Sequence, residues 1–275
     1  MTLAVSLRVP DGLVIASDSL STTTGHIGIA AEFEGPCPKC HENIKIKKVS
    51  LPPIQIPTSL SSFAQKVFPF NRAFGIATFG IAILNEKTIY YHVRKLEKNT
   101  NETFSGATEV AKFIMNYFNT EIRKQISDIE KAPDDFYPLG FIVAGYDGDI
   151  AKTIVVSIGK KSKIKENIGS GCTYGGDGEV VNKLWELSKS DPRRATTYAT
   201  FSLQDAVDYA EYLIYSTANF QRFSNMIPTV GGYVDIGLIT PFKEFTWIKC
   251  KEMTEILEKE QSLRRGGLCN EKSII

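Results

Sequence analysis

The sequence predicts an α+β fold with two antiparallel sheets. Strand-like and helix-like segments come in separate runs rather than in strict alternation, which is typical of that class. Tight turns join neighbouring strand segments at both ends of the chain, so these segments read as hairpins. The helical segments each carry one apolar stripe, which suits helices that cover a sheet. We expect one domain with insertions near residues 30–45 and 51–70.

The chain opens with a predicted hairpin. Residues 3–9 are apolar and β-branched, Pro10-Asp11-Gly12 marks a turn, and residues 13–17 form the second strand. Proline-rich stretches then mark the two insertions. The remaining predicted strands lie at residues 47–51, 74–79, 139–144 and 153–158, in a short segment ending at 168, and at 234–240 and 245–249.

Four helices are predicted from 3.6-residue periodicity, at residues 81–97, 107–124 and 177–188 and from residue 203 onward. Ser202 is the expected N-cap of the last of these. Its apolar stripe comprises Leu203, Ala206, Val207, Ala210, Leu213, Ile214 and Thr217. We expect residues 251–275 to form a charged helix and a loose tail.

The charge and composition argue against several classes of protein. The 32 basic and 31 acidic residues give a net charge of +1, which provides no long-range field for nucleic acid or anionic membranes. No apolar stretch reaches the roughly 18 residues of a spanning helix, and the N-terminus lacks the features of a signal peptide. Five cysteines in 275 residues make no disulfide framework. We therefore expect a cytoplasmic protein with no nucleic-acid or membrane partner.

The first two residues suggest a chemistry. Methionine before a small residue such as threonine is usually removed, so the mature chain is expected to begin at Thr2. A threonine at the N-terminus carries both a hydroxyl nucleophile and a free amine, whose intrinsic pKa of about 7.7–8.0 lets it act as the base. Many proteins begin with Met-Thr, however, so this start alone is weak evidence.

The segments after Thr2 make the resemblance specific. The Asp11-Gly12 turn, Ala16-Ser17-Asp18-Ser19 and Thr22-Thr23-Thr24-Gly25 together resemble the start of a mature proteasome β subunit. The resemblance covers about residues 2–250. It implies the N-terminal nucleophile (Ntn) hydrolase fold, a four-layer αββα sandwich, with Thr2 as the catalytic residue at the start of a central strand.

In that family an aspartate and a lysine support the nucleophile. Asp18 matches the aspartate, and the resemblance points to Lys48 as the lysine, with Lys47 as the alternative because the preceding insertion blurs the register. A lysine beside the hydroxyl favours the forming alkoxide, and Asp18 would keep that lysine charged. The other interpretation is a strand-end aspartate and a solvated surface lysine.

Two further motifs match the family. Ala77-Thr78-Phe79-Gly80 resembles the segment whose glycine amide stabilises the oxyanion, which points to Gly80, although a helix start would also favour a small residue there. Gly169-Ser170-Gly171 resembles the loop whose serine contacts the threonine amine, which points to Ser170. Pocket-lining positions map to Ser21, Thr78 and Ala82, whose small side chains favour an apolar or mixed cleavage preference.

One segment departs from the usual β subunit. The family carries an aspartate and a serine before the last glycine pair, whereas residues 224–230 contain no acid here. The run Arg222-Phe223-Ser224-Asn225 instead resembles the ancestral bacterial β-subunit family, Anbu, which also begins with Met-Thr. The missing polar contact is assigned to Ser224, Asn225 or Thr229.

Cys37-Pro38-Lys39-Cys40 has the spacing of a zinc knuckle. A structural zinc site needs four ligands, and this run supplies two, Cys37 and Cys40. His26, His41 or a neighbouring subunit are candidates for the rest; the alternative is a tight loop with two thiols. No other cofactor is expected.

We therefore predict a threonine-type endopeptidase that acts on peptides or unfolded proteins through an acyl-enzyme. The resemblance implies a homo-oligomeric ring or helical stack, with an ATPase as a candidate partner. Two other functions stay open. One is a non-catalytic subunit of a proteasome-like assembly, and the other is an Ntn amidase or transpeptidase.

Overall fold

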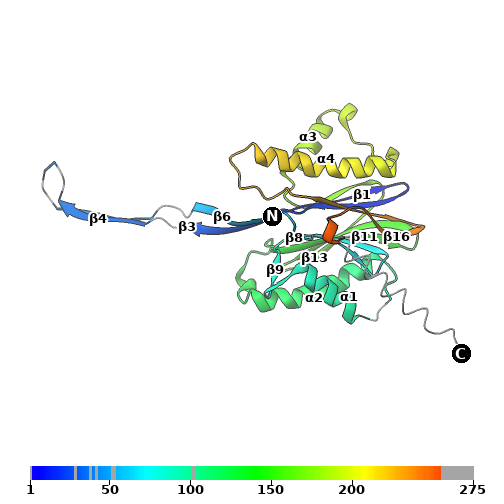
Figure 1. Cartoon of the computed structure of the whole chain (residues 1–275), viewed down its shortest axis with the longest axis horizontal. Coiled ribbons are helices and arrows are strands. Elements are labelled where there is room, and N and C mark those ends of the chain that lie inside the picture. Colours follow the sequence, from blue (N-terminus) through cyan, green and yellow to red (C-terminus); the bar gives the residue numbers. More distant parts are fainter. Residues whose placement is uncertain are drawn as a thin grey trace. The chain divides into compact units, whose positions relative to one another are not determined.

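The computed structural model describes residues 2–27, 30–36, 39–40, 43–50, 54–100 and 103–254 (Figure 1). The chain divides into two compact units. The main unit comprises residues 1–21 and 61–275, and the second unit comprises residues 22–60. Every candidate catalytic residue except Lys48 belongs to the main unit.

The main unit contains two five-stranded sheets whose neighbouring strands are all antiparallel. The first sheet has the order β14 (Gly171–Gly176), β1 (Leu3–Val9), β2 (Gly12–Asp18), β15 (Val234–Thr240) and β16 (Lys243–Lys249). The second has the order β13 (Lys163–Ile168), β12 (Ile150–Ile158), β11 (Leu139–Asp147), β8 (Phe74–Gly80) and β7 (Val67–Phe70).

Helices cover both sheets (Figure 1). Helices α3 (Glu179–Ser190) and α4 (Leu203–Arg222) pack with the first sheet, and α1 (Ile89–Asn99) and α2 (Ala107–Gln125) pack with the second. Short 3-10 helices span Ile129–Lys131, Pro192–Arg194 and Tyr198–Thr200. The predicted mixed helix-and-sheet class with antiparallel sheets is confirmed.

Three apolar clusters hold these layers together. One lies between α1, α2 and the second sheet, and another lies between α3, α4 and the first sheet. A third joins the two sheets and includes Ala4, Ile15, Ala77 and Ile142. Strands β1 and β2 are buried along their whole length because they take part in the second and third clusters at once.

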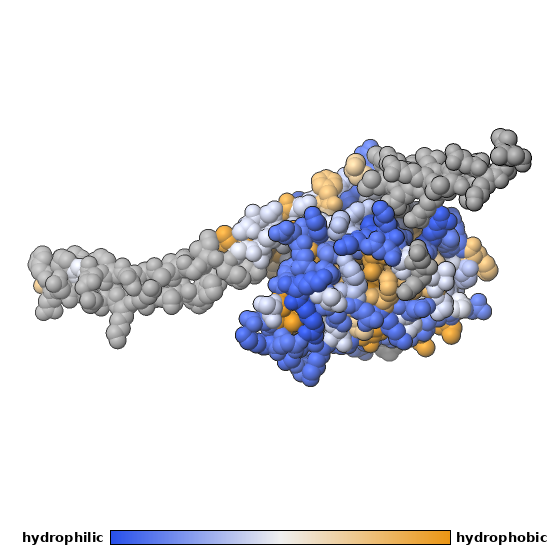
Figure 2. All heavy atoms as spheres, turned by 90° about the horizontal axis from the view of Figure 1, so that it is seen from below, coloured by the Kyte–Doolittle hydropathy of each residue, from blue (hydrophilic) through white to orange (hydrophobic). Residues whose placement is uncertain are grey.

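Helix α4 follows its sequence pattern closely. The Ser202 hydroxyl accepts from the Asp205 amide, and the Asp205 carboxylate accepts from the Ser202 amide, so the start is a capping box. The predicted stripe is buried except for Leu203, which is partly buried, and it continues to Gln221. The other face of α4 is polar or aromatic. Figure 2 looks at the side of the main unit that carries α1 and α2, and the side chains on that side are also mainly hydrophilic.

The helix predicted at residues 81–97 begins later. Residues 83–88 form a small hairpin, β9 (Ile83–Leu84) and β10 (Lys87–Thr88), before α1 starts at Ile89. Asn85 and Glu86 have positive φ, which a helix does not allow, and Thr88 caps α1 by accepting from the Tyr91 amide. Among the described residues, no helix is long and apolar enough to cross a membrane.

The described strands of the second unit form two pairs. Strand β3 (Ser21–Ile27) pairs with β6 (Ile54–Ser61), and β4 (Ala30–Pro36) pairs antiparallel with β5 (Asn43–Ser50). The sequence predicts two insertions, near 30–45 and 51–70, whereas the structure groups residues 22–60 as one unit. Residues 67–70 belong to the second sheet, because their apolar side chains are buried in its core.

Candidate active site at the start of strand β1

Thr2 directly precedes strand β1 and is 3% exposed. The peptide bond that follows it is held on both sides. The Leu3 amide donates to Asp18 Oδ1 at 3.0 Å, and the Asp177 amide donates to the Thr2 carbonyl oxygen at 2.7 Å. Gly176 permits this approach, because a Cβ there would lie 1.8 Å from that oxygen. The backbone of Thr2 is therefore fixed by strands on either side.

Asp18 ends strand β2 next to Thr2 and is fully buried. Its carboxylate also accepts from the Leu20 and Gly231 amides, both at 3.0 Å. The Lys66 ammonium lies 3.1 Å from both carboxylate oxygens and donates to the Leu20 carbonyl at 2.5 Å. The 5% exposed Lys66 is thus part of a buried ion pair beside the Thr2–Leu3 peptide.

Burial acts on both members of this pair. It raises the pKa of the Asp18 carboxyl and lowers the pKa of the Lys66 ammonium, and the attraction between the two groups opposes each shift. The amides that donate to Asp18 also favour its charged form. The charge of Lys66 therefore depends on Asp18.

The sequence points to Lys48 as the partner of Asp18, and the structure instead brings Lys66 to it. Lys47 and Lys48 lie in β5 of the second unit, and their side chains fall outside the described residues. The physical reason is the length of the second unit, whose 39 residues separate Ser21 from the next segment of the main unit. Lys66 directly precedes β7, the edge strand of the second sheet.

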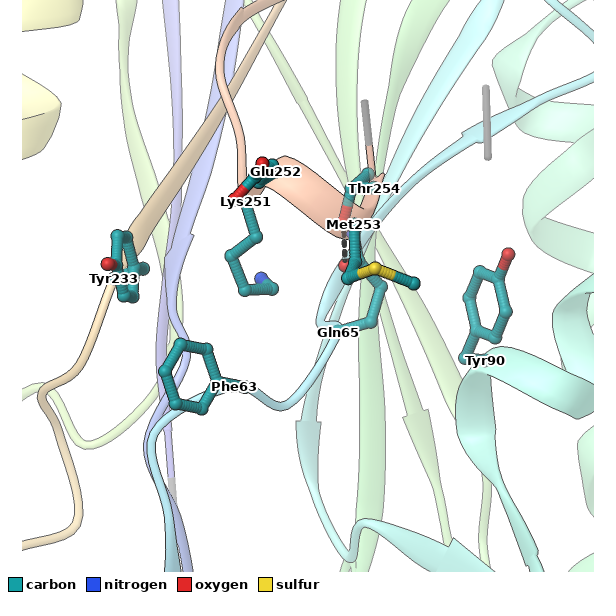
Figure 3. Close-up of a pocket in the computed structure, with 8 residues that line it drawn as sticks. All are labelled: Phe63, Gln65, Tyr90, Tyr233, Lys251, Glu252, Met253 and Thr254. Carbon is teal, nitrogen blue, oxygen red and sulfur yellow. Dashed lines mark hydrogen bonds between the residues drawn. The ribbon is translucent and has the colours of Figure 1, made fainter. Parts of the chain in front are cut away.

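A second buried ion pair lies close to the first. The Lys251 ammonium pairs with Asp235 Oδ2 and donates to Ser19 Oγ at 3.0 Å, and Ser19 is the neighbour of Asp18. Lys251 also lines a pocket of about 430 Å³. Figure 3 shows Phe63 and Tyr233 on one side of this pocket and Tyr90 on the other.

Gly80 ends strand β8 with φ +100°, and a Cβ there would lie 2.3 Å from the Pro138 carbonyl oxygen. The Ile81 amide donates to that oxygen on the β11 side, whereas the Thr78 amide donates to the Lys66 carbonyl on the β7 side. Amides alternate along a strand, so the Gly80 amide points to the Lys66 side. This geometry suits an oxyanion donor and does not match a helix start, because α1 begins at Ile89.

Ser170 does not lie at Thr2. The antiparallel register of β1 and β14 pairs Leu3 with Gly176 and Arg8 with Gly171. Ser170 precedes Gly171 and therefore lies just beyond the Arg8 end of β1, about 20 Å along the strand from Leu3 at about 3.4 Å per residue. Its side chain is exposed. The resemblance in sequence is present, but the register directs this serine to the other end of the sheet.

Of the three residues assigned to the missing polar contact, one joins the site. Thr229 Oγ1 donates to Asp177 Oδ2 at 2.8 Å, and Gln221 Nε2 donates to the same oxygen at 2.7 Å. Ser224 instead donates to the Gln221 carbonyl at the end of α4, and Asn225 is exposed. Thr229 thus connects to Thr2 through Asp177, whose amide holds the Thr2 carbonyl.

The predicted pocket positions are distributed over three places. Ser21 begins β3 and is partly buried, Thr78 is buried in β8 beside Lys66, and Ala82 is exposed after β8. None of them lines the 430 Å³ pocket. The structure therefore leaves their role in substrate preference as a prediction.

The zinc knuckle falls mostly outside the described residues. Cys37 and His41 lie outside them, as does the side chain of His26, while Cys40 is exposed in a turn. Among the described residues no group of three or more histidine, cysteine or acidic side chains is arranged to hold a metal. Zinc binding at Cys37 and Cys40 stays a prediction.

Three residues of the site were missed from the sequence: Lys66, Asp177 and Gln221. Lys66 sits directly before the apolar run 67–70, a signal for a strand-end lysine. Asp177 lies between glycines, where a backbone turn exposes its amide. Gln221 continues the apolar stripe of α4 one turn beyond Thr217, which signals a polar side chain directed into the core.

No protein-family model matches the sequence, and no curated protein matches it. Solved structures do. An Anbu mutant from Hyphomicrobium sp. strain MC1 is 13% identical with a TM-score of 0.53, and both chains are covered over 100% of their length. Anbu (ancestral β-subunit) from Yersinia bercovieri is 12% identical with a TM-score of 0.53 and 99% and 98% coverage. At these identities the likeness establishes the fold, and the chain shares the fold of Anbu.

Proposed function

We propose that this protein is an N-terminal threonine endopeptidase of the proteasome β-subunit type. The single observation that carries the proposal is the buried Asp18–Lys66 pair, bound through Asp18 to the amide of the Thr2–Leu3 peptide. A buried lysine needs a reason, because burying an ion pair costs several kcal/mol for each ion, by order of magnitude. Activation of an adjacent nucleophile provides one.

The proposed mechanism begins after removal of Met1. The Thr2 amine takes the hydroxyl proton, directly or through a water, and Oγ attacks the carbonyl carbon of a peptide bond. The Lys66 charge favours the oxygen anion of the nucleophile, and the Gly80 amide donates to the oxyanion of the tetrahedral intermediate. The Thr2 ammonium then protonates the leaving amine as the C–N bond breaks. Water, deprotonated by the same amine, then attacks the ester carbonyl carbon, and the C–Oγ bond breaks as the ammonium returns the proton to Thr2 Oγ.

The fold supports this assignment. We interpret the two facing sheets with their helical covers as the four-layer αββα sandwich of Ntn hydrolases. In this interpretation the substrate is a peptide or an unfolded chain, and the protein acts in the cytoplasm as a homo-oligomeric ring or helical stack. An ATPase partner would supply unfolded chains.

One observation favours the alternative of a non-catalytic subunit. Thr2 is 3% exposed, and a residue so covered cannot meet a substrate unless Met1 leaves or the chain moves. The amidase or transpeptidase alternative shares the same acyl-enzyme. Product analysis with and without an added amine acceptor distinguishes transfer from hydrolysis.

The test is the intact mass of the protein after incubation with an epoxyketone, which reacts with both the hydroxyl and the free amine of an N-terminal threonine. We expect a chain without Met1 that gains one inhibitor mass, and we expect Thr2→Ala to gain none. Thr22→Ala, in the second unit, is the matched control and should label like the wild type. A chain that retains Met1 would contradict the proposal and favour the non-catalytic subunit.

A further inference from the structure

The end of strand β14 brings an acid to the nucleophile that the sequence pattern does not anticipate. The register of β1 and β14 pairs Leu3 with Gly176, so the next pair outward is Thr2 with Asp177. The 2.7 Å bond from the Asp177 amide to the Thr2 carbonyl shows that this pairing continues past the strand ends. Asp177 is therefore the cross-strand neighbour of Thr2.

The Asp177 carboxylate is held by a buried polar frame. Its Oδ2 accepts from Thr229 Oγ1 at 2.8 Å and from Gln221 Nε2 at 2.7 Å. Gln221 is only 2% exposed, and its Oε1 accepts from the amides of Thr229 and Val230 at 2.8 and 3.0 Å. Such a frame fixes the carboxylate in one orientation. Among the described residues, Oδ1 accepts no hydrogen bond, so it is free to bind another donor.

The geometry of an extended chain makes the Thr2 α-amine a candidate for this donor. The N–H and C=O of one residue point to the same side of a strand, so the α-amine of mature Thr2 lies on the side of its carbonyl. That side faces Asp177. The stretch before Gly231-Gly232 contains no acid that could serve the amine instead.

We infer that Asp177, oriented by Thr229 and Gln221, is the residue that positions the Thr2 α-amine. The inference rests on the proposed function, since the amine is free only after Met1 is removed. The carboxylate accepts a hydrogen bond from the amine and stabilises its ammonium form. A negative charge within hydrogen-bonding distance raises the pKa of an amine. The amine that receives the proton from Thr2 Oγ is thereby held in one orientation.

The experiment measures the rate of epoxyketone labelling as a function of pH, with intact mass as the readout. We compare the wild type with Asp177→Asn and Thr229→Val, and use Asp149→Asn, an exposed turn residue, as the control. For Asp177→Asn we expect a plateau rate about tenfold lower and an acid limb shifted about 1 pH unit lower, because the uncompensated amine loses its proton more easily. For Thr229→Val we expect a plateau rate about threefold lower with the acid limb in place, and for Asp149→Asn neither change.

The outcomes separate this inference from the proposed function. If the wild type labels and Asp177→Asn labels with the same rate and the same acid limb, the inference is wrong and the peptidase proposal stands. A lower plateau without a shift of the limb would also overturn it, because a purely structural role has that result. If Asp177→Asn does not fold, the test is Thr229→Val: labelling of this variant at the same rate as the wild type overturns the inference. If the wild type itself does not label after losing Met1, the failure belongs to the proposed function.

Discussion

Strand β1 has a buried cation at each of its ends, and the two cations have different kinds of partner. At the Thr2 end, Lys66 pairs with the Asp18 carboxylate at 3.1 Å. At the other end, Arg8 donates to the Gly169 carbonyl at 2.8 Å and to Thr173 Oγ1 at 2.7 Å, which are neutral oxygens. Burial lowers the pKa of both cations, and only Lys66 has a carboxylate that opposes the shift.

The two ends therefore differ in kind. At one end the protonation of the cation depends on its partner, and at the other end the cation links two strands. A guanidinium keeps its proton in proteins, so Arg8 can be satisfied by neutral oxygens. A buried ammonium loses its proton readily, so the charge of Lys66 is set by Asp18. The Thr2 end therefore contains a charge that depends on its carboxylate partner beside the Thr2–Leu3 peptide, whereas the Arg8 end contains a fixed charge that connects β1 to β14.

The largest expected effect comes from removing each cation. Lys66→Met leaves the buried Asp18 carboxylate uncompensated, which should lower the free energy of unfolding by about 3–5 kcal/mol and abolish epoxyketone labelling. Arg8→Met leaves only neutral acceptors unsatisfied and should cost about 1–3 kcal/mol, with labelling retained. Urea denaturation measures both.

The control is the double variant Asp18→Asn with Lys66→Met. It should be more stable than Lys66→Met alone, because no buried charge is left without a partner. Equal losses of stability for Lys66→Met and Arg8→Met would remove the distinction between the two ends.

An intermediate effect is expected from the glycines near the two ends. Both Gly80 and Gly169 have positive φ, but a Cβ on Gly80 meets the Pro138 carbonyl oxygen at 2.3 Å and one on Gly169 meets nothing within 4 Å. Gly169→Ala should therefore cost about 1–2 kcal/mol from its backbone conformation alone. Gly80→Ala adds the clash and should cost more.

Thermal or urea unfolding compares the two alanine variants, and labelling provides a second readout. Gly80→Ala should slow labelling by about 100-fold if its amide is the oxyanion donor, and Gly169→Ala should leave the rate unchanged. Similar labelling rates for both would argue against the Gly80 amide in that role.

The smallest effect is expected for Ser170→Ala. The serine is exposed at the Arg8 end of β1, so its loss should change the free energy of unfolding by less than about 0.5 kcal/mol and leave the labelling rate unchanged. Slower labelling by Ser170→Ala would mean that the serine does reach the Thr2 amine, and that the register of β14 differs in the active protein.

The periodic parts of the fold were predictable. The opening hairpin, the helix at 107–124 and helix α4 with its Ser202 cap all follow local patterns of period 2 or 3.6. The late start of α1 was not predictable in this way, because it depends on positive φ at Asn85 and Glu86 rather than on hydrophobicity.

The site was predictable where local sequence defines it. Asp18 and Gly80 lie at strand ends beside recognisable motifs, and the structure brings both to one region with Lys66. Lys66 could not be identified from the sequence, because the second unit inserts residues 22–60 between Asp18 and the segment that carries Lys66. Ser170 was misplaced because its location depends on the antiparallel register of two strands more than 160 residues apart, as the 161-residue separation of Arg8 and Gly169 indicates.

The Lys251–Asp235 pair has a consequence for shortened forms of the protein. A boundary drawn after strand β16, at residue 250, would remove Lys251 and leave Asp235, which is fully buried, without its cation. Ser19 would lose a hydrogen bond at the same time, directly beside Asp18. A truncated version that is meant to be compared with the full chain must therefore end after Lys251, or replace Asp235 with asparagine.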